Sequence, residues 1–249
     1  MPPKAYMFGM PYECYEQFHV RKYGFHGTSH RFVSMKYGEV TGKSLEGLNI
    51  VSCHLGNGSS ITAIKDGKSV DTSMGFTPLD GIIMGTRSGS VDPSAVEFVQ
   101  NKLGFTPAQM SDYLNKKSGF LGLSGQFSDN RDITSAAQQG DKRSQLVTDM
   151  LTYEIKKYIG SYTAAMNGLD VVIFTGGIGE NAPEVRKGVC ENMEYLGIKL
   201  DNSVNDGLKG KLTKISAPDS KVEVWVIPTN EELLIARDTL EITGLDKNA

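Results

Sequence analysis

The sequence predicts an α/β protein with α+β layering, in which helices pack on a sheet. Residues 48–73 contain three consecutive β-type segments separated by tight turns. Helical patterns dominate from there to residues 170–175, a continuous apolar run of the kind found in a buried strand. Because a meander of strands comes first and helices follow, the two kinds of element should form separate layers.

The first hairpin contains a candidate phosphate-binding turn, Gly-Asn-Gly at 56–58, between the β-type segments 49–54 and 60–65. Glycine has no Cβ, so the N–H groups of this turn can approach an anion closely, and asparagine tolerates a positive φ. An ordinary hairpin without a ligand is the simpler alternative. A second turn at 66–67 leads into a third strand, 68–72.

The segment 74–93 is rich in glycine and yet apolar, which predicts a packed and functional loop rather than a surface one. Arg87 lies in it among the small residues from Gly85 to Gly89. These neighbours leave the guanidinium room to reach a ligand, and a surface ion pair is the alternative.

A basic and aromatic loop, R-K-Y-G-F-H-G-T-S-H at 21–30, leads into a predicted helix that ends near Tyr37. His26 and His30 are four residues apart, but the glutamate of the H-E-x-x-H motif is missing, so we do not expect zinc. A hydrogen-bonded structural imidazole is the simplest role for each. Gly-Lys-Ser at 42–44 is no P-loop, because Tyr37 stands where that motif needs glycine.

Capping signals and apolar periodicity predict the remaining helices. Asp92-Pro93 and Thr106-Pro107 are helix starts, and the longest stripe with helical spacing lies within 141–167. We expect helices at about 93–103, 107–117, from 133, 141–167, 181–194 and 230–242, with a glycine- and serine-rich loop over 119–131.

The apolar run 170–175 continues directly into Gly-Gly-Ile-Gly-Glu-Asn at 176–181. A strand, a glycine-rich turn and a helix start form an anion-binding unit, because backbone N–H groups and the helix dipole converge there. The same residues match the G-x-G-x-x-A pattern of dinucleotide-binding folds. Since only one further clear strand follows, at 222–227, we do not favour that fold.

Composition argues against several partners. The 26 basic and 29 acidic residues are mixed, with a net charge of −3, so we expect neither nucleic-acid nor membrane binding. No apolar run has the length of a membrane span, and the first residues lack the apolar core of a signal peptide. Cys14, Cys53 and Cys190 show no C-x-x-C spacing, which favours reduced thiols in a cytoplasmic protein.

Three glycine-rich segments, 56–58, 85–89 and 176–179, together predict a polyphosphate ligand. Arg87 and His26 are the candidate cations, and Glu231 is a candidate carboxylate for a metal ion. Phosphate-binding turns in a β-meander, with another turn after a later strand, are the arrangement of the ATPase fold shared by actin, Hsp70 and the sugar kinases.

The chain resembles the acetate kinase (acetokinase) family in five motifs that occur in the family order between about residues 5 and 237. They are R-K-Y-G-F-H-G-T-S-H, H-L-G-N-G-S-S, M-G-F-T-P-L-D-G-I-I-M-G-T-R-S-G-S-V-D-P, T-G-G-I-G-E-N and I-P-T-N-E-E-L. The resemblance implies a ribonuclease-H-like ATPase fold and reversible transfer of the γ-phosphoryl group of ATP to acetate, which gives ADP and acetyl phosphate.

The resemblance also implies residue roles. It places His26 and Arg87 at the transferring phosphoryl group as catalytic residues, Phe25 and Pro78 beside the acetyl group, and Glu231 on Mg²⁺ or Mn²⁺. The implied nucleotide-binding residues are His54, Leu55, Gly56, Asn57, Gly58, Asp129, Asn130, Arg131, Gly176, Gly177, Ile178, Gly179, Glu180 and Asn181.

Members of this family have an N-terminal domain of the same fold, with a catalytic aspartate and part of the acetate pocket, ahead of the region that this chain resembles. We therefore expect a C-terminal half, in which residues 1–232 bind the nucleotide and form a homodimer. Residues 233–249 should form a helix that packs on the N-terminal domain, with its apolar side exposed or repacked here. Such a half should be inactive by itself.

Two alternatives stay open. One alternative to an acetate kinase is a non-catalytic module that binds a nucleotide and dimerises, and the other is part of a propionate or butyrate kinase. The acyl preference of those sister enzymes depends on pocket residues that lie partly outside this sequence.

Overall fold

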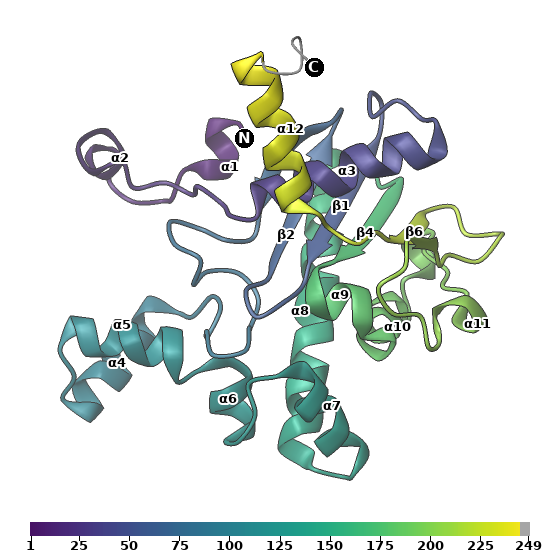
Figure 1. Cartoon of the computed structure of the whole chain (residues 1–249). Helices are drawn as coiled ribbons and strands as arrows, with labels where there is room; N and C mark the ends of the chain where they lie inside the picture. Colours follow the sequence, from purple (N-terminus) through teal and green to yellow (C-terminus); the bar gives the residue numbers. More distant parts are fainter. Residues whose placement is uncertain (245–249) are drawn as a thin grey trace.

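A six-stranded mixed sheet in the order β3-β2-β1-β4-β6-β5 forms the centre of the structure, a computed structural model that describes residues 1–244 (Figure 1). Strand β2 pairs antiparallel with β1 and β3, β4 pairs parallel with β1 and β6, and β5 pairs antiparallel with β6. The strands are β1 Asn49–His54, β2 Ser60–Lys65, β3 Lys68–Thr72, β4 Val171–Thr175, β5 Thr213–Lys214 and β6 Glu223–Val226.

Alternating side chains of the central strands enter two cores, one on each face of the sheet. On β4, Val172 and Phe174 belong to the larger core, whereas Val171 and Ile173 belong to the smaller one. The larger core is covered by α6 Gly119–Ser124, α7 Asn130–Gln138, α8 Lys142–Met166 and α10 Pro183–Cys190. The smaller core is covered by α3 Gly27–Thr41 and α12 Glu231–Thr243, which lie beside each other in Figure 1.

The remaining helices are short or lie away from the sheet (Figure 1). They are α1 Pro3–Tyr6, α2 Tyr12–Phe18, α4 Pro93–Leu103, α5 Pro107–Lys116, α9 Gly176–Asn181, the 3-10 helix η1 Glu194–Leu196 and α11 Asn202–Asn205. Among residues 1–244, no helix combines the length and the apolar character that a bilayer crossing needs.

The predicted meander is confirmed, with β1, β2 and β3 at the expected residues. The predicted helix over 181–194 is wrong, because residues 176–181 already form α9 and a second helix begins at Pro183. Proline disfavours the α conformation in the residue before it, and Ala182 has φ −112° and ψ 84°. The segment 119–131 is also not all loop, since α6 occupies its first half.

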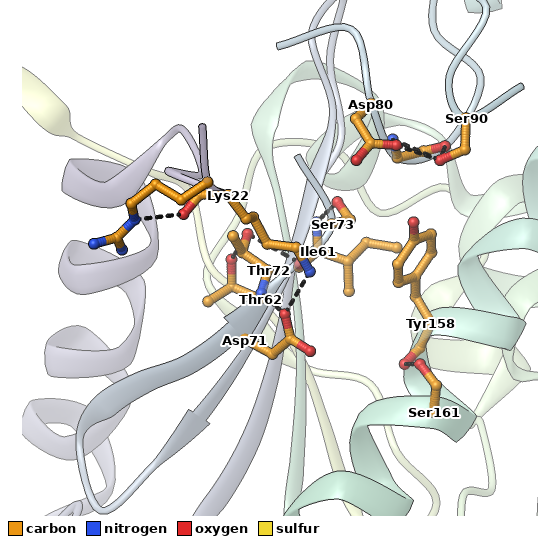
Figure 2. A network of polar contacts seen from close by, with 12 residues as sticks. Lys22, Ile61, Thr62, Asp71, Thr72, Ser73, Asp80, Ser90, Tyr158 and Ser161 are labelled. Carbon is orange, nitrogen blue, oxygen red and sulfur yellow. Dashed lines mark hydrogen bonds and ion pairs between the residues drawn. The ribbon is translucent and has the colours of Figure 1, made fainter. Parts of the chain in front are cut away.

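The segment that leads to His26 is fixed to the end of β3 by polar contacts (Figure 2). Lys22 Nζ lies 2.8 Å from Asp71 Oδ1, and the N–H of Tyr23 donates to the carbonyl of Gly75 at 3.0 Å. The hydroxyls of Thr62 and Thr72 are 2.8 Å apart on the neighbouring strands. These contacts place the start of α3 against the meander.

Helix α12 packs on α3 through one buried side chain, Leu234, and through an ion pair of Arg31 with Asp238 at 2.6 Å. Its other large apolar side chains, Leu233, Ile235, Leu240 and Ile242, are exposed. Residues 245–249 of the expected C-terminal segment lie outside the described residues. The docking of this helix on another domain stays a prediction.

Arg186 on α10 is fully buried and connects two segments through hydrogen bonds of its guanidinium. Its Nη1 donates to the carbonyl of Gly179 (2.9 Å), its Nη2 to that of Leu208 (2.9 Å) and its Nε to Oδ1 of Asn205 (2.8 Å). Burial lowers the pKa of Arg186 to about 10. The guanidinium thus satisfies backbone carbonyls that water does not reach.

We expect Arg186→Met to lower the free energy of unfolding by about 2–4 kcal/mol, because it leaves several buried acceptors unpaired. Urea denaturation followed by circular dichroism measures this change. Lys116→Met is the matched control, since its ion pair with Asp112 is exposed and should contribute less than about 1 kcal/mol. Equal midpoints for the two variants would contradict the structural role of Arg186.

Candidate active site

Two glycine-rich segments meet at the carboxyl ends of β1 and β4. The two strands are parallel neighbours, with His54 opposite Thr175, so the residues that follow each strand leave the sheet at the same edge. The carbonyl of Leu55 accepts hydrogen bonds from the N–H groups of Ile178 (2.8 Å) and Gly179 (3.2 Å). This pairing holds the start of α9 against the β1–β2 turn.

The β1–β2 turn is closed by its own serine. Ser59 Oγ lies 3.1 Å from the N of Gly56 and 3.0 Å from its carbonyl oxygen. A Cβ added to Gly56 would lie 3.9 Å from the N of Gly177, which shows how near the two glycine segments are. Gly177 itself faces open space. Backbone N–H groups of both segments therefore border one hollow.

That hollow is a cleft of about 780 Å³ between α7, α9 and the β1–β2 turn. It brings together eight of the predicted nucleotide-binding residues, Gly56, Asn57, Asp129, Asn130, Arg131, Gly177, Ile178 and Asn181. The others, His54, Leu55, Gly58, Gly176, Gly179 and Glu180, do not line it. Sequence analysis missed the lining residues Thr134, Gln138, Ala182, Pro183, Glu184, Gly207 and Lys209. Residues 207 and 209 belong to a glycine- and lysine-containing loop whose position depends on the burial of Arg186.

At one side of this cleft, Asp129 caps α7. Its Oδ1 accepts from the N–H of Arg131 (2.8 Å), and its carboxylate is paired with the Arg131 guanidinium at 3.0 and 2.7 Å. Arg131 lowers the pKa of the Asp129 carboxyl through these hydrogen bonds. The pair is exposed, so both side chains remain accessible from the cleft.

Glu180 turns its carboxylate into the protein. Its Oε1 accepts from the N–H of Gly176 (2.9 Å) and from the N–H of Thr229 (3.2 Å). The carboxylate thus links the start of α9 to the turn that precedes α12. Glu231, the candidate metal ligand, is the first residue of that helix.

The loop that contains Arg87 is packed, as predicted. Ile82, Ile83 and Met84 are buried, and the N–H of Ile83 donates to Oε2 of Glu154 on α8 at 2.7 Å. Figure 2 shows the side chains of Asp80 and Ser90 in contact across this loop, with Ser90 Oγ 2.5 Å from Asp80 Oδ1. These contacts give the Arg87 backbone a fixed position.

Arg87 meets the predicted histidine at the β1–β2 turn. A Cβ added to Gly58 would lie 3.2 Å from Nη1 of Arg87 and 3.5 Å from Nε2 of His26. Position 58 therefore needs a residue without a side chain if both groups are to approach the turn. Arg87 Nη1 also donates to the carbonyl of Pro78 at 3.4 Å.

His26, His30 and His54 form a cluster beneath this point. The rings of His26 and His54 are stacked, with centroids 4.1 Å apart and planes at 18°. Burial, and next the Arg87 charge, lower the pKa of His26, and burial with the neighbouring His26 lowers the pKa of His54 to about 4. Both causes disfavour the imidazolium form of His26, in contrast to the expectation that it is a cation.

The two residues predicted beside an acetyl group are not brought into one hollow. Phe25 lines a separate groove of about 440 Å³ between α3 and the meander, together with Tyr23 and Thr72. Pro78 lines neither this groove nor the larger cleft, and its carbonyl accepts from Arg87.

Within residues 1–244, no group of three or more His, Cys, Asp or Glu side chains is placed to hold a metal ion. Magnesium in phosphate-transfer sites is usually bound by one or two carboxylates together with substrate phosphates. A single carboxylate at Glu231 is compatible with that mode. The hydroxyl of Thr229, buried two residues before it, has no hydrogen-bond partner in the described part of the chain.

Comparison with known proteins gives a consistent result. The sequence profile of the acetokinase family matches residues 1–237. The acetate kinase of Carboxydothermus hydrogenoformans is 57% identical over 242 residues, which cover 97% of this chain and 60% of that protein. The chain thus spans about 60% of the length of the curated relatives that it matches, in agreement with the predicted correspondence to the C-terminal portion of such a protein.

Solved structures agree with the fold. The crystal structure of Porphyromonas gingivalis acetate kinase superposes with a TM-score of 0.96 at 49% identity, covering 98% of this chain and 61% of that one. A propionate kinase from Francisella tularensis gives a TM-score of 0.88 at 41% identity, covering 95% and 60%. The predicted ATPase-type fold is therefore confirmed. Profile, sequence identity and structure agree, and the chain belongs to the acetokinase family.

Proposed function

We propose that this chain is the nucleotide-binding part of an enzyme that transfers the γ-phosphoryl group of ATP reversibly to acetate. The observation that carries the proposal is the convergence of the β1–β2 turn, the start of α9, Arg87 and His26 at one edge of the sheet, beside a cleft of about 780 Å³. That volume lies within the range of small-molecule sites. The proposal concerns an enzyme of the length of the relatives, and this chain matches about 60% of that length.

The chemistry requires charge compensation rather than a general base. A carboxylate nucleophile is already ionised near pH 7, but it must approach a phosphoryl group of the same sign. Arg87 supplies a permanent positive charge and a planar set of donors at the position where the glycines leave room. His26 supplies an N–H donor without a charge of its own. Both would stabilise the equatorial oxygens of the phosphoryl group during transfer.

The nucleotide would bind in the large cleft. The N–H groups of Gly56, Gly176, Ile178 and Gly179 donate within the protein. The phosphates would therefore be bound by the N–H groups of the neighbouring residues Asn57 and Gly177, which line the cleft. The Asp129–Arg131 pair on α7 would border the adenosine. Glu180 would act indirectly, because its carboxylate fixes the glycine turn instead of facing the cleft. Mg²⁺, held by Glu231 and the phosphates, would supply further charge neutralisation.

Because the chain is also similar to a propionate kinase, acetate and propionate are both candidate acyl substrates. Phe25 and Pro78 are proposed to contact it, although the two side chains border different spaces here. We also propose a cytoplasmic homodimer. Support comes from the family resemblance and from the free state of Cys14, Cys53 and Cys190.

The test combines nucleotide binding with turnover. Mg-ADP binding to the chain is measured by calorimetry, and acyl phosphate formed from ATP and acetate or propionate is trapped as hydroxamate. Binding with hydroxamate formation supports the kinase, and the better acid identifies the substrate. Binding without turnover favours the non-catalytic module for this chain. No binding of Mg-ADP contradicts the proposal.

Gly177→Leu should block the cleft without unfolding the protein. Gly177 faces open space and has an ordinary φ, so a leucine fits sterically and projects into the nucleotide site. We expect at least about tenfold weaker Mg-ADP binding, equivalent to about 1.4 kcal/mol, with an unchanged melting temperature of the free chain. Gly160→Leu on α8, also in open space but outside the cleft, is the control. Unimpaired binding by Gly177→Leu would place the nucleotide elsewhere.

Arg87→Lys should weaken the binding of ATP more than that of ADP, because Arg87 is proposed to contact the γ-phosphoryl group. Lysine keeps the positive charge but loses the planar donor set, and a lost hydrogen bond to a charged group costs about 1.5–3 kcal/mol, so Mg-ATP affinity should fall about tenfold or more. Mg-ADP affinity should change little. Arg143→Lys, which alters an exposed arginine bound to the carbonyls of Leu123 and Gly122, is the control. Equal losses for ATP and ADP would remove Arg87 from the transferring group.

A further inference from the structure

A buried chain of side chains leads from strand β1 to the ring of His26. Oγ of Ser52 lies 2.9 Å from Nδ1 of His30, and Nε2 of His30 lies 2.7 Å from Oγ of Ser60. The same Ser60 oxygen lies 2.9 Å from Nδ1 of His26. Ser52 and Ser60 are fully buried and His30 is 4% exposed, so water cannot replace any of these partners.

The direction of these hydrogen bonds follows from Ser52, the side chain farthest from His26 in this series. A hydroxyl carries one proton, and a neutral imidazole carries one proton on one of its two nitrogens. Within residues 1–244, Nδ1 of His30 is the only partner of the Ser52 hydroxyl. If His30 carried its proton on Nδ1, the buried Ser52 proton would have no acceptor, which is unfavourable.

His30 is therefore protonated on Nε2 and donates from it to Ser60. Burial and the two neighbouring histidines hold the pKa of His30 well below its usual range, so a doubly protonated ring is not available. Ser60, which already accepts from His30, then uses its own proton to donate to Nδ1 of His26. Any other assignment leaves a serine proton buried without an acceptor.

We propose that Ser52, His30 and Ser60 are positioning residues that fix His26 as the Nε2–H tautomer, with this N–H directed to the phosphoryl site beside Arg87. The inference rests on the proposed function for the role of that site, but the tautomer itself does not. His26 touches the reacting group in this scheme, and the other three act through it.

His54 is fixed in the same way by a separate serine. Oγ of Ser29 lies 2.8 Å from Nδ1 of His54, and Ser29 is fully buried with no other side-chain hydrogen bond among the described residues. Ser29 must donate, so His54 also carries its proton on Nε2. The two stacked rings thus present N–H groups and not lone pairs on their Nε2 atoms.

A fixed tautomer matters because the two ring forms have opposite effects on an anion. An Nε2–H group attracts a phosphoryl oxygen, whereas a bare Nε2 lone pair repels it. Since the proton order is set by buried serines, the ring needs no rearrangement when the phosphoryl group arrives. This is preorganisation without a second positive charge near Arg87.

The tautomers are measured directly in the full chain labelled with ¹⁵N-histidine, by long-range ¹H–¹⁵N correlation at pH 7.5. The nitrogen that carries the proton has a ¹⁵N shift distinct from the bare one. We expect His26, His30 and His54 each in the Nε2–H form. A wild-type spectrum with His26 protonated on Nδ1 would overturn the proposal whatever the variants do.

Ser60→Ala should release His26 into a mixture of both tautomers and leave His54 unchanged, and Ser29→Ala should do the reverse. Ser34→Ala is the control, because Ser34 is equally buried on α3 but bonds only to the carbonyl of Arg31. Ser60→Thr keeps the hydroxyl and should keep the wild-type tautomer. This variant still tests the role of the hydroxyl if Ser60→Ala does not fold. A single Nε2–H form of His26 in folded Ser60→Ala would contradict the role of Ser60.

Adding Mg-ATP separates this inference from the proposed function. A change of the His26 Nε2 shift supports both. If no shift changes while the wild-type tautomers are as expected, the proposed site fails and the tautomer assignment stands. With equal populations of the two tautomers in Ser60→Ala, binding through His26 should weaken about twofold, because only half of the molecules are competent.

Discussion

The site depends on the parallel pairing of β1 with β4 in one register, His54 opposite Thr175. Both strands end at the same edge of the sheet, so the Gly-Asn-Gly turn and the start of α9 leave it side by side. The Leu55 carbonyl then accepts from two N–H groups of α9, which fixes the distance between the segments. A shift of one residue would send alternate side chains to the wrong core and separate the glycines from each other.

Around this edge the protein places one permanent charge and two neutral rings. Arg87 enters from a loop that is fixed to α8 through Glu154 and closed by Asp80 and Ser90. His26 and His54 are stacked and partly buried. Desolvation lowers the pKa of both, with the Arg87 charge as a second cause for His26 and the neighbouring His26 as a second cause for His54. A second positive charge would add repulsion in the free protein, whereas neutral N–H donors add attraction only when an anion is present. The buried serines beneath the rings are consistent with donors that carry no charge.

Two polar side chains, Glu180 and Arg186, connect the walls of the large cleft. Glu180 joins the start of α9 to the turn before Glu231, so the phosphate segment and the candidate metal ligand share one hydrogen-bonded unit. Arg186 joins the same α9 to residues 205–208, which lead to the lining residues Gly207 and Lys209. Neither residue lines the cleft. These hydrogen bonds fix the walls of the cleft to one another.

The sequence by itself determined the elements whose signals are local. Hairpin turns, capping residues and apolar periodicity depend on neighbours within a few positions, so β1, β2, β3, α4, α5 and α8 lie where they were expected, and the motifs that line the cleft were found. Tertiary structure decided the rest. The lowered pKa of His26 depends on which groups are packed against it, and the inward turn of Glu180 depends in part on the distant N–H of Thr229. The lining by Thr134 and Lys209 depends on elements that meet only in the fold. Charge state and side-chain direction are set by contacts across the chain, and a linear pattern does not contain them.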